Sequence, residues 1–142
     1  MSTKKEFEAL SDFRYQLRRF LRFSEEAVAG VGITSLQYLL LLHIKGYRGR
    51  DWASVGELAE RLQTHHHGVV ALVSRCEKLG LVKRKTGTGD RRRVEVRLTA
   101  RGERCVSRLA LLHRNELKSL RSEFLVPAIE FPGRSSKARG SR

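Results

Sequence analysis

The sequence predicts a mainly α-helical fold with a minor β component. Apolar residues recur every three to four positions along most of the 142-residue chain, which is typical of amphipathic helices. Two capping boxes, Thr34-Ser35-Leu36-Gln37 and Ser54-Val55-Gly56-Glu57, mark helix starts. After Gly80 the helical period changes to alternation, which is typical of strands. The order is two helices, a pair of helices joined by a short turn, a hairpin and a long final helix.

The first two helices have recognisable ends. The first carries apolar residues at helical spacing from position 7 to position 28, and we expect Gly30 and Gly32 to end it. The second begins after Thr34 and is apolar nearly all round, so it should be buried. Gly46 can stop it.

The next two helices form a unit. The box at Ser54 opens a short helix whose inner face carries Leu58, Ala59 and Leu62. Another helix begins four residues later and runs to Leu79, before Gly80. A turn this short between helices predicts a helix-turn-helix.

A hairpin and a last helix follow. We expect strands at 81–85 and 93–98, joined by a turn at 86–90, in a two-stranded arrangement. The second strand should place Val94, Val96 and Leu98 inward and its charged residues outward. The last helix should begin at about Ala100 and end or bend at Pro127. Its apolar positions are Val106, Leu109, Leu112, Leu117, Leu120 and Phe124.

Composition restricts the class of partner. The chain has 29 Lys and Arg against 15 Asp and Glu, a net charge of +14. So large a surplus favours an anionic partner, with nucleic acid ahead of an anionic membrane surface. The longest apolar run, at 38–42, is too short to span a bilayer, and the N-terminus has no apolar signal core. Two cysteines do not make a disulfide framework, so we expect a reducing cytoplasm.

From residue 7 to about residue 120 the chain resembles the MarR family of winged helix-turn-helix transcriptional regulators. The resemblance rests on Glu57-Leu58-Ala59-Glu60-Arg61-Leu62, on the segment from Leu72 to Val82, on Asp90-Arg91-Arg92-Arg93 and on Leu98-Thr99-Ala100-Arg101-Gly102. It implies a bacterial, nucleoid-associated regulator, more often a repressor, that binds double-stranded DNA as a homodimer. Its first and last helices would pack together above two DNA-binding lobes.

This resemblance sets the expected domain organisation. Residues 1–33 form an N-terminal dimerisation helix, and residues 34–98 form the winged helix-turn-helix lobe. Residues 99–131 form a C-terminal dimerisation helix. Residues 132–142 are small, polar and basic, which predicts a disordered tail.

The stretch THHHGVV, residues 64–70, opens the second helix of the helix-turn-helix. At 100° per residue, the core side of this helix carries Val69, Leu72, Val73 and Cys76. Its outer surface carries small and polar groups, as a helix in the major groove requires. The expected DNA-contacting residues are His65, His66, His67, Val70, Ala71, Ser74, Arg75 and Lys78.

A metal site at the three histidines is disfavoured. Consecutive helical residues point about 100° apart, so the three imidazoles cannot converge on one tetrahedral ion. We therefore expect no metal and no other cofactor. The remaining alternatives are contact with DNA or three solvated histidines. Gly68 weakens the first turn, and relatives usually carry hydroxyl or Arg residues here, so an unusual operator is expected.

The hairpin supplies a second basic element. Its expected DNA-contacting residues are Arg84, Lys85, Asp90, Arg91 and Arg92. In the family, the wing Asp pairs with an Arg and an arginine at the tip enters the minor groove. This implies that Asp90 pairs with Arg92, and that Arg91 or Arg92 enters the groove, where narrow A·T-rich sequence attracts arginine. The alternative is a solvated basic hairpin.

The resemblance also implies an effector pocket between the dimer helices and the DNA lobes. Its expected lining residues are Phe13, Leu17, Phe20, Tyr38, His43 and Trp52. The last three carry polar groups that could orient a small aromatic or anionic effector. Core packing explains most of these residues equally well.

Other functions stay as alternatives. A basic architectural nucleic-acid-binding protein would need only charge, and a metal-responsive regulator would need zinc for DNA binding. Cys76 and Cys105 could sense oxidants, although a buried Cys is most often an apolar filler. We expect no enzyme, because the sequence has no HExxH motif, no nucleophile with an ordered base and no phosphate-binding glycine loop.

Overall fold

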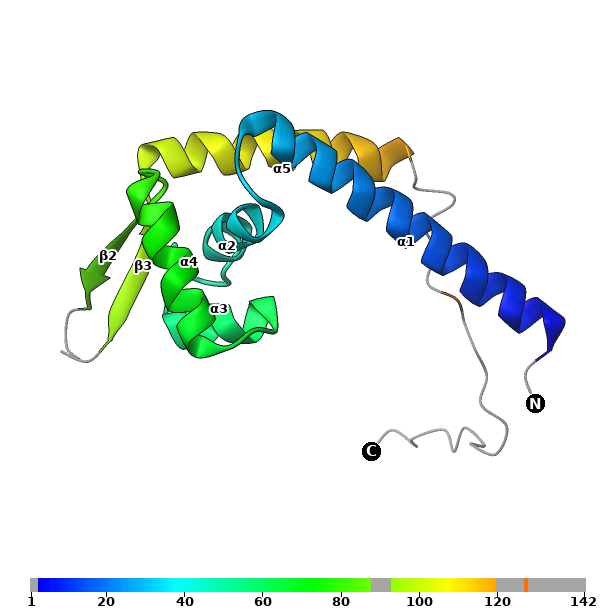
Figure 1. The fold of residues 1–142 in the computed structure, drawn as a ribbon, viewed down its shortest axis with the longest axis horizontal. Helices are drawn as coiled ribbons and strands as arrows, with labels where there is room; N and C mark the ends of the chain where they lie inside the picture. The colour runs from blue at the N-terminus through cyan, green and yellow to red at the C-terminus, as the bar shows by residue number, and fades with distance from the viewer. Residues whose placement is uncertain (1–2, 88–92, 120–126, 128–142) are drawn as a thin grey trace, which may run out of the picture.

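The computed structural model describes residues 3–87, 93–119 and 127 of the chain (Figure 1). Its elements are α1 (Lys4–Val31), α2 (Ser35–Lys45), β1 (Trp52–Ala53), α3 (Val55–Leu62), α4 (His66–Lys78), β2 (Val82–Thr86), β3 (Val94–Leu98) and α5 (Ala100–Ser119). This order confirms the predicted fold class, a mainly helical winged helix-turn-helix with long helices at both ends.

The two long helices form the upper part of the molecule. In Figure 1, α5 runs along the top and α1 extends away from the rest of the fold, while α2, α3, α4 and the sheet lie below one end of α5. The helices α1 and α5 contact each other, and α2 contacts both of them. Most of α1 therefore projects beyond the lobe that carries the helix-turn-helix.

Side-chain caps fix where the helices begin. Thr34 accepts a hydrogen bond from the backbone of Gln37, Ser54 accepts one from the backbone of Glu57, and both capping boxes are complete, as predicted. Thr3 and Glu6 make a third box at the start of α1, which the sequence analysis did not identify.

Glycines end the first two helices, with one correction. Gly46 follows α2, as predicted. Gly32 follows α1 in the left-handed conformation (φ 84°) and donates its N–H to the carbonyl of Ala29. The prediction that Gly30 ends α1 was wrong, because Gly30 stays within the helix. Only Gly32 adopts the backbone conformation that stops it.

The core lies where α2 crosses the lobe. Its fully buried side chains include Leu40, Leu41 and Ile44 of α2, Leu58 of α3, Val69, Val73 and Cys76 of α4, Val96 of β3, and Val106 and Leu109 of α5. The prediction that α2 is buried all round was wrong, because Leu36 is 52% exposed and Leu39 is 36% exposed. That side of α2 is open because Leu39 borders a groove between α1, α2 and α5.

The sheet has three strands instead of the expected two. Its order is β1-β3-β2, and all pairs are antiparallel. The unpredicted β1 has only two residues and places Trp52 opposite Arg97 and Ala53 opposite Val96. As a result β3 is the central strand of the sheet.

The inward and outward positions of β3 differ in part from the prediction. Val96 is buried and Leu98 packs against the core, as expected. Val94 is 38% exposed, because it lies at the end of the strand nearest the hairpin tip. Glu95 was expected outward but is only 5% exposed, because Arg93 and Arg97 both contact it.

The last helix is described as far as Ser119. Val106 and Leu109 are buried as predicted, while Leu112 and Leu117 are exposed. Leu120, Phe124 and the expected effect of Pro127 on the helix concern residues 120–126, which lie outside the described part of the chain.

Within the described residues, no single helix has the length and apolar character needed to cross a membrane. The helices α1 and α2 meet the criteria of length and composition only when they are taken together, and they meet at a bend of 94°.

Candidate nucleic-acid interface

The second helix of the helix-turn-helix, α4, begins without a side-chain cap. Gln63 adopts the left-handed conformation (φ 51°) that turns the chain from α3 toward α4. His65 is the N-cap of α4, and its side chain makes no capping hydrogen bond. The first N–H groups of α4 therefore receive no bond from the N-cap side chain, and the positive end of the helix dipole favours an anion there.

The two faces of α4 are those that the periodicity predicts. Its core side carries Val69, Leu72, Val73 and Cys76, all buried. On its other sides, His66, His67, Val70, Ala71, Arg75 and Lys78 are exposed and Ser74 is half-buried. The N-terminal half of this outer surface has no acidic residue. It offers imidazoles and small apolar side chains that can approach the edges of base pairs.

The three histidines of THHHGVV are all exposed. The rings of His65 and His67 stack with their centroids 6.4 Å apart and 19° between their planes. In the described part of the chain, no three His, Cys, Asp or Glu side chains lie together as metal ligands would.

Arg84 of β2 lies across α4. Its guanidinium donates to the hydroxyl of Ser74 (2.8 Å), to the carbonyl of Val70 (3.3 Å) and to the Glu77 carboxylate (Nη1–Oε1 3.2 Å). The backbone N–H of Arg84 donates to the other oxygen of Glu77 (3.3 Å). Arg84 therefore joins the hairpin to the outer face of α4, and these bonds fix the position of the hairpin relative to the helix.

A groove of about 610 Å³ lies between the start of α3, the outer face of α4 and the hairpin. Its lining residues are Ser54, Val55, Gly56, His66, Val70, Ser74, Arg84, Arg93 and Val94. The groove contains two arginines, two hydroxyls and a histidine but no carboxylate. Such a lining suits an anionic, partly apolar partner.

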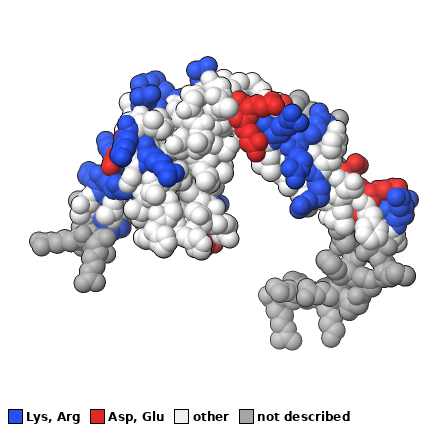
Figure 2. Space-filling view, viewed as in Figure 1, with Lys and Arg blue, Asp and Glu red and all other residues white. Residues whose placement is uncertain are grey.

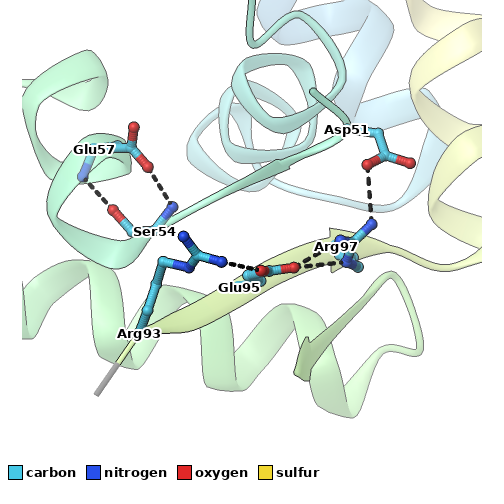
Figure 3. Close-up of polar contacts among 6 residues, drawn as sticks. All are labelled: Asp51, Ser54, Glu57, Arg93, Glu95 and Arg97. Atoms are coloured by element: carbon cyan, nitrogen blue, oxygen red, sulfur yellow. Dashed lines mark hydrogen bonds and ion pairs between the residues drawn. The ribbon is translucent and has the colours of Figure 1, made fainter. Parts of the chain in front are cut away.

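Charged side chains order the base of the hairpin (Figure 3). Glu95 accepts hydrogen bonds from Arg93 (3.1 Å) and from Arg97 (2.6 Å and 3.2 Å), and Arg97 also donates to Asp51 (2.9 Å). Hydrogen bonding from Arg97 is the main cause that lowers the pKa of Glu95; burial opposes it. Gly87 lies close against this cluster, since a Cβ there would lie 2.6 Å from Nε of Arg93 and the Arg93 side chain would have to shift.

Aromatic rings support the same cluster. The guanidinium of Arg93 lies 4.7 Å from the ring centroid of Trp52, and that of Arg50 lies 3.8 Å from it. Arg50 also pairs with Glu57, the capping residue of α3. The cluster therefore connects the hairpin to the start of the helix-turn-helix. Trp52 was expected in the effector pocket, but the structure places it here.

Basic side chains gather in two places on the face of the molecule that Figure 2 draws. One group of Lys and Arg lies over the hairpin and the neighbouring start of α5, and another lies along α1, while the surface over α3 carries few charges. Lys85 is exposed on β2. Asp90, Arg91 and Arg92 lie outside the described residues, so the predicted Asp90–Arg92 pair and the arginine at the tip do too.

A second, more apolar groove lies between α1, α2 and α5, with a volume of about 610 Å³. His113 is buried beside it. Its Nδ1–H donates to the carbonyl of Leu109 (2.6 Å), so its Nε2 is free to accept from the hydroxyl of Ser24 (2.6 Å). Its ring stacks on Tyr38 at 4.9 Å. Burial raises the pKa of Tyr38.

Two of the six residues expected in the effector pocket, Phe20 and Tyr38, line this groove. Phe13, Leu17 and His43 are half-buried elsewhere, and burial and the nearby Arg61 lower the pKa of His43. The sequence analysis did not identify His113, and it named Arg93 only within the motif Asp90-Arg91-Arg92-Arg93. The helical spacing of His113 from Leu109 was a usable signal for a buried position.

Comparison with known proteins finds one matching family model. The model of the MarR family matches residues 31–93, which include the helix-turn-helix and most of the hairpin. This region is similar to the MarR family. The match confirms the resemblance that the motifs indicated. No curated protein sequence matches the chain.

Solved structures share the MarR fold over most of the chain. A MarR family protein from Bacillus stearothermophilus has a TM-score of 0.75 at 23% identity, with 88% of this chain and 85% of that chain covered. AbsC, a MarR family transcriptional regulator from Streptomyces coelicolor, has a TM-score of 0.72 at 22% identity, with 89% and 85% covered. A mutant of S. aureus MepR bound to an oligodeoxyribonucleotide has a TM-score of 0.66 at 20% identity, with 87% and 85% covered.

Proposed function

We propose that the protein is a sequence-specific DNA-binding transcriptional regulator and not an enzyme. The observation that carries this is the outer face of α4, whose exposed N-terminal half stands beside a groove lined by Arg84 and Arg93. The α4 helix would lie in the major groove of the DNA. The phosphate backbone of the DNA would then lie in the protein groove lined by Arg84 and Arg93. The MepR structure with bound oligodeoxyribonucleotide has the same fold, which supports this assignment.

Within this assignment, the residues have different roles. The side chains free to reach base edges are His66, His67, Val70 and Ala71, with His65 at the open helix start. Val70 and Ala71 suit thymine methyl groups, and the imidazoles suit base edges or phosphates. Ser74 and Arg84 already bond each other, so they chiefly hold the helix and hairpin in register. Arg75, Lys78, Lys85 and the residues at the hairpin tip, Asp90, Arg91 and Arg92, would add phosphate and minor-groove contacts.

The active form would be a homodimer. Apolar side chains stay exposed along the two long helices, where no other part of the described chain covers them. They are Phe7, Leu10, Tyr15 and Leu21 on α1 and Leu111, Leu112 and Leu117 on α5. Pairing of these helices in two copies would bury this surface and set two α4 helices on a near-palindromic operator, with half-sites about 34 Å apart. Dimerisation would involve residues 1–33 and 99–131.

The regulator would be a repressor that responds to a small aromatic or anionic effector. The groove beside His113 has the volume typical of small-molecule sites and polar groups on an apolar wall. An effector that prefers one spacing of the lobes would shift the population away from the DNA-competent form.

Fluorescence anisotropy with the upstream DNA of its own gene tests the proposal. We expect that DNA to bind with at least hundredfold higher affinity than scrambled DNA, with affinity falling steeply as salt rises. His67→Ala should weaken binding to the upstream DNA by about 5- to 100-fold and leave scrambled DNA unaffected. Ser107→Ala, an exposed neutral position on α5, is the matched control.

Two results would support the other candidates. Equal affinity for upstream and scrambled DNA, with the same salt dependence, would indicate an architectural binder that depends on charge. Loss of binding on addition of a chelator would indicate a metal-responsive regulator.

A further inference from the structure

A row of side chains alternates arginines with aromatic rings and runs from the end of α3 to the base of the hairpin. The guanidinium of Arg61 lies 5.8 Å from the ring centroid of Tyr47, and that of Arg50 lies 4.2 Å from the same centroid. The guanidinium of Arg50 also lies 3.8 Å from the ring centroid of Trp52, and that of Arg93 lies 4.7 Å from it. Each distance is short enough for a cation–π contact. These residues, the arginine–aromatic row, form a continuous path between two elements of the candidate interface.

Carboxylates hold the row at two points. One oxygen of Glu57 accepts hydrogen bonds from the hydroxyl of Tyr47 (2.5 Å) and from Arg50. The other oxygen of Glu57 completes the capping box of α3. At the hairpin end, Glu95 accepts a hydrogen bond from Arg93 (3.1 Å). The row is therefore bonded both to the first turn of α3 and to the central strand of the sheet.

Arg93 is the member of the row that faces the groove between α3, α4 and the hairpin. Its side chain lines that groove and is 38% exposed. Arg84 lines the same groove and is held by its bonds to α4. Arg93 is held instead by Glu95 and by the ring of Trp52. The two arginines of the groove are thus positioned by different elements.

Stabilisation of the fold alone is a poor explanation of this arrangement. Three guanidiniums in one row repel each other, and apolar side chains would join the same segments without that repulsion. An apolar contact would not, however, hold a guanidinium at the wall of an open groove. The ring of Trp52 does this for Arg93, from a strand of only two residues at the edge of the sheet.

We propose that Trp52 is a positioning residue for DNA binding: its ring holds the guanidinium of Arg93 where a backbone phosphate of bound DNA enters the groove. This inference rests on the proposed function, because it takes DNA as the ligand of the groove. A guanidinium that is fixed before DNA arrives loses less side-chain freedom on binding than a mobile one. Phosphate contacts carry no sequence information, so Trp52 contributes to affinity for every duplex and not to the choice among sequences.

Fluorescence anisotropy with the full-length protein tests this role, on the upstream DNA and on scrambled DNA across a salt series. Trp52→Leu should weaken binding to both DNAs by the same factor, about 3- to 10-fold, and reduce the dependence of log affinity on log salt by about one unit of slope. Trp52→Phe keeps a ring beside Arg93 and should restore binding to within about twofold of the wild-type protein.

A double-mutant cycle measures whether Trp52 acts through Arg93. Arg93→Gln should weaken binding about as much as Trp52→Leu, and the double variant should bind no more weakly than Arg93→Gln alone. A ring that only stabilised the fold would instead give losses that add. Circular dichroism verifies that each variant folds.

A second variant keeps the test decisive if Trp52→Leu does not fold. Arg50→Gln removes the guanidinium that lies on the ring of Trp52, and it should show the same loss of affinity and the same dependence on Arg93. Arg48→Gln is the matched control, because it removes the same charge from an exposed position of the same loop outside the row. It should change the affinity less than twofold.

The outcomes separate this role from the proposed function. Wild-type affinity and salt dependence in Trp52→Leu, or additive losses in the cycle, would overturn the role of Trp52 and leave the proposed function standing. Equal affinity of the wild-type protein for both DNAs would refute a sequence-specific regulator, and the cycle would still decide the role of Trp52, since phosphate contacts are common to all duplexes. Absence of binding to either DNA would overturn both.

Discussion

Replacement of Gly102 by alanine tests how the lobe is joined to α5. Gly102 is buried in the first turn of α5, and a Cβ there would lie 2.0 Å from the carbonyl oxygen of Leu81. Ordinary contact begins at 3.4 Å, so the two segments would have to separate by about 1.4 Å. The same carbonyl accepts the backbone N–H of Thr99 (3.0 Å), so the separation would also disrupt that bond.

The cost follows from these two effects. Overpacking of a buried site typically costs about 1–3 kcal/mol, and a lost backbone hydrogen bond costs about 1 kcal/mol. We therefore expect Gly102→Ala to lower the free energy of unfolding by about 2–4 kcal/mol. For a chain of this length, the midpoint of thermal unfolding should fall by roughly 8–15 °C.

Urea denaturation at fixed protein concentration measures the change, with the slope m as a check on the unfolding model. Gly68→Ala is the matched control, because a Cβ at that helical position would lie 3.7 Å from the Thr64 hydroxyl, an ordinary contact. It should be neutral or stabilise the protein by up to about 1 kcal/mol. If Gly102→Ala were as stable as Gly68→Ala, the close approach of α5 to Leu81 would be refuted.

Three further outcomes follow from buried or bonded groups. Burial raises the pKa of Cys76 from 9.0 to about 11, so the folded state keeps a proton that the unfolded state releases. Stability should fall as the pH rises from about 9 toward 11, by up to about 2–3 kcal/mol, and Cys76→Val should reduce this fall in denaturation curves; an unchanged fall would contradict the assignment. Hydrogen bonding from Arg97 lowers the pKa of Glu95, so its stabilisation is present above about pH 4.5 and lost as the pH falls through its lowered pKa. Glu95→Gln should be less stable at neutral pH and show a flatter acid branch, whereas parallel curves would argue against the cluster. Arg84→Lys keeps the charge but loses the forked donor, and urea denaturation should show a loss of about 0.5–1 kcal/mol; no loss would mean that the Arg84 contacts with α4 are not formed in solution.

The sequence predicted those features of the fold that depend on neighbouring residues. The capping boxes of Thr34 and Ser54 each involve only four consecutive residues, so they can be predicted without any tertiary information. The same holds for Val69, Val73 and Cys76, whose burial follows from helical periodicity alone. Glu95 could not be placed in this way, because its burial depends on Arg97 and on the short strand β1, which pairs across more than 40 residues.

The same distinction between local sequence and tertiary contacts applies to the candidate interface. The outward position of His67 and Val70 was predictable from their place on α4. The bond between Arg84 and Ser74 was not, because it depends on how closely β2 passes the helix. His113 was missed for a related reason: its partners, Ser24 and Tyr38, come from two other helices that meet only in the folded chain.

The contact of Arg84 with Ser74 and Glu77 has a consequence for attempts to redesign the operator preference of this protein. The place of Ser74 on the outer face of α4 makes it a natural choice for introducing a larger side chain that contacts a base. However, its hydroxyl accepts a hydrogen bond from Arg84 that holds the hairpin against α4. A substitution of Ser74 chosen to contact one more base pair would remove its hydrogen bond with Arg84. The hairpin would then shift relative to α4 and would contact the neighbouring groove of the DNA at a different position. Selection experiments on α4 should therefore randomise positions 74, 77 and 84 together. In a library confined to the helix, many variants would lose the contacts with Arg84 that position the hairpin.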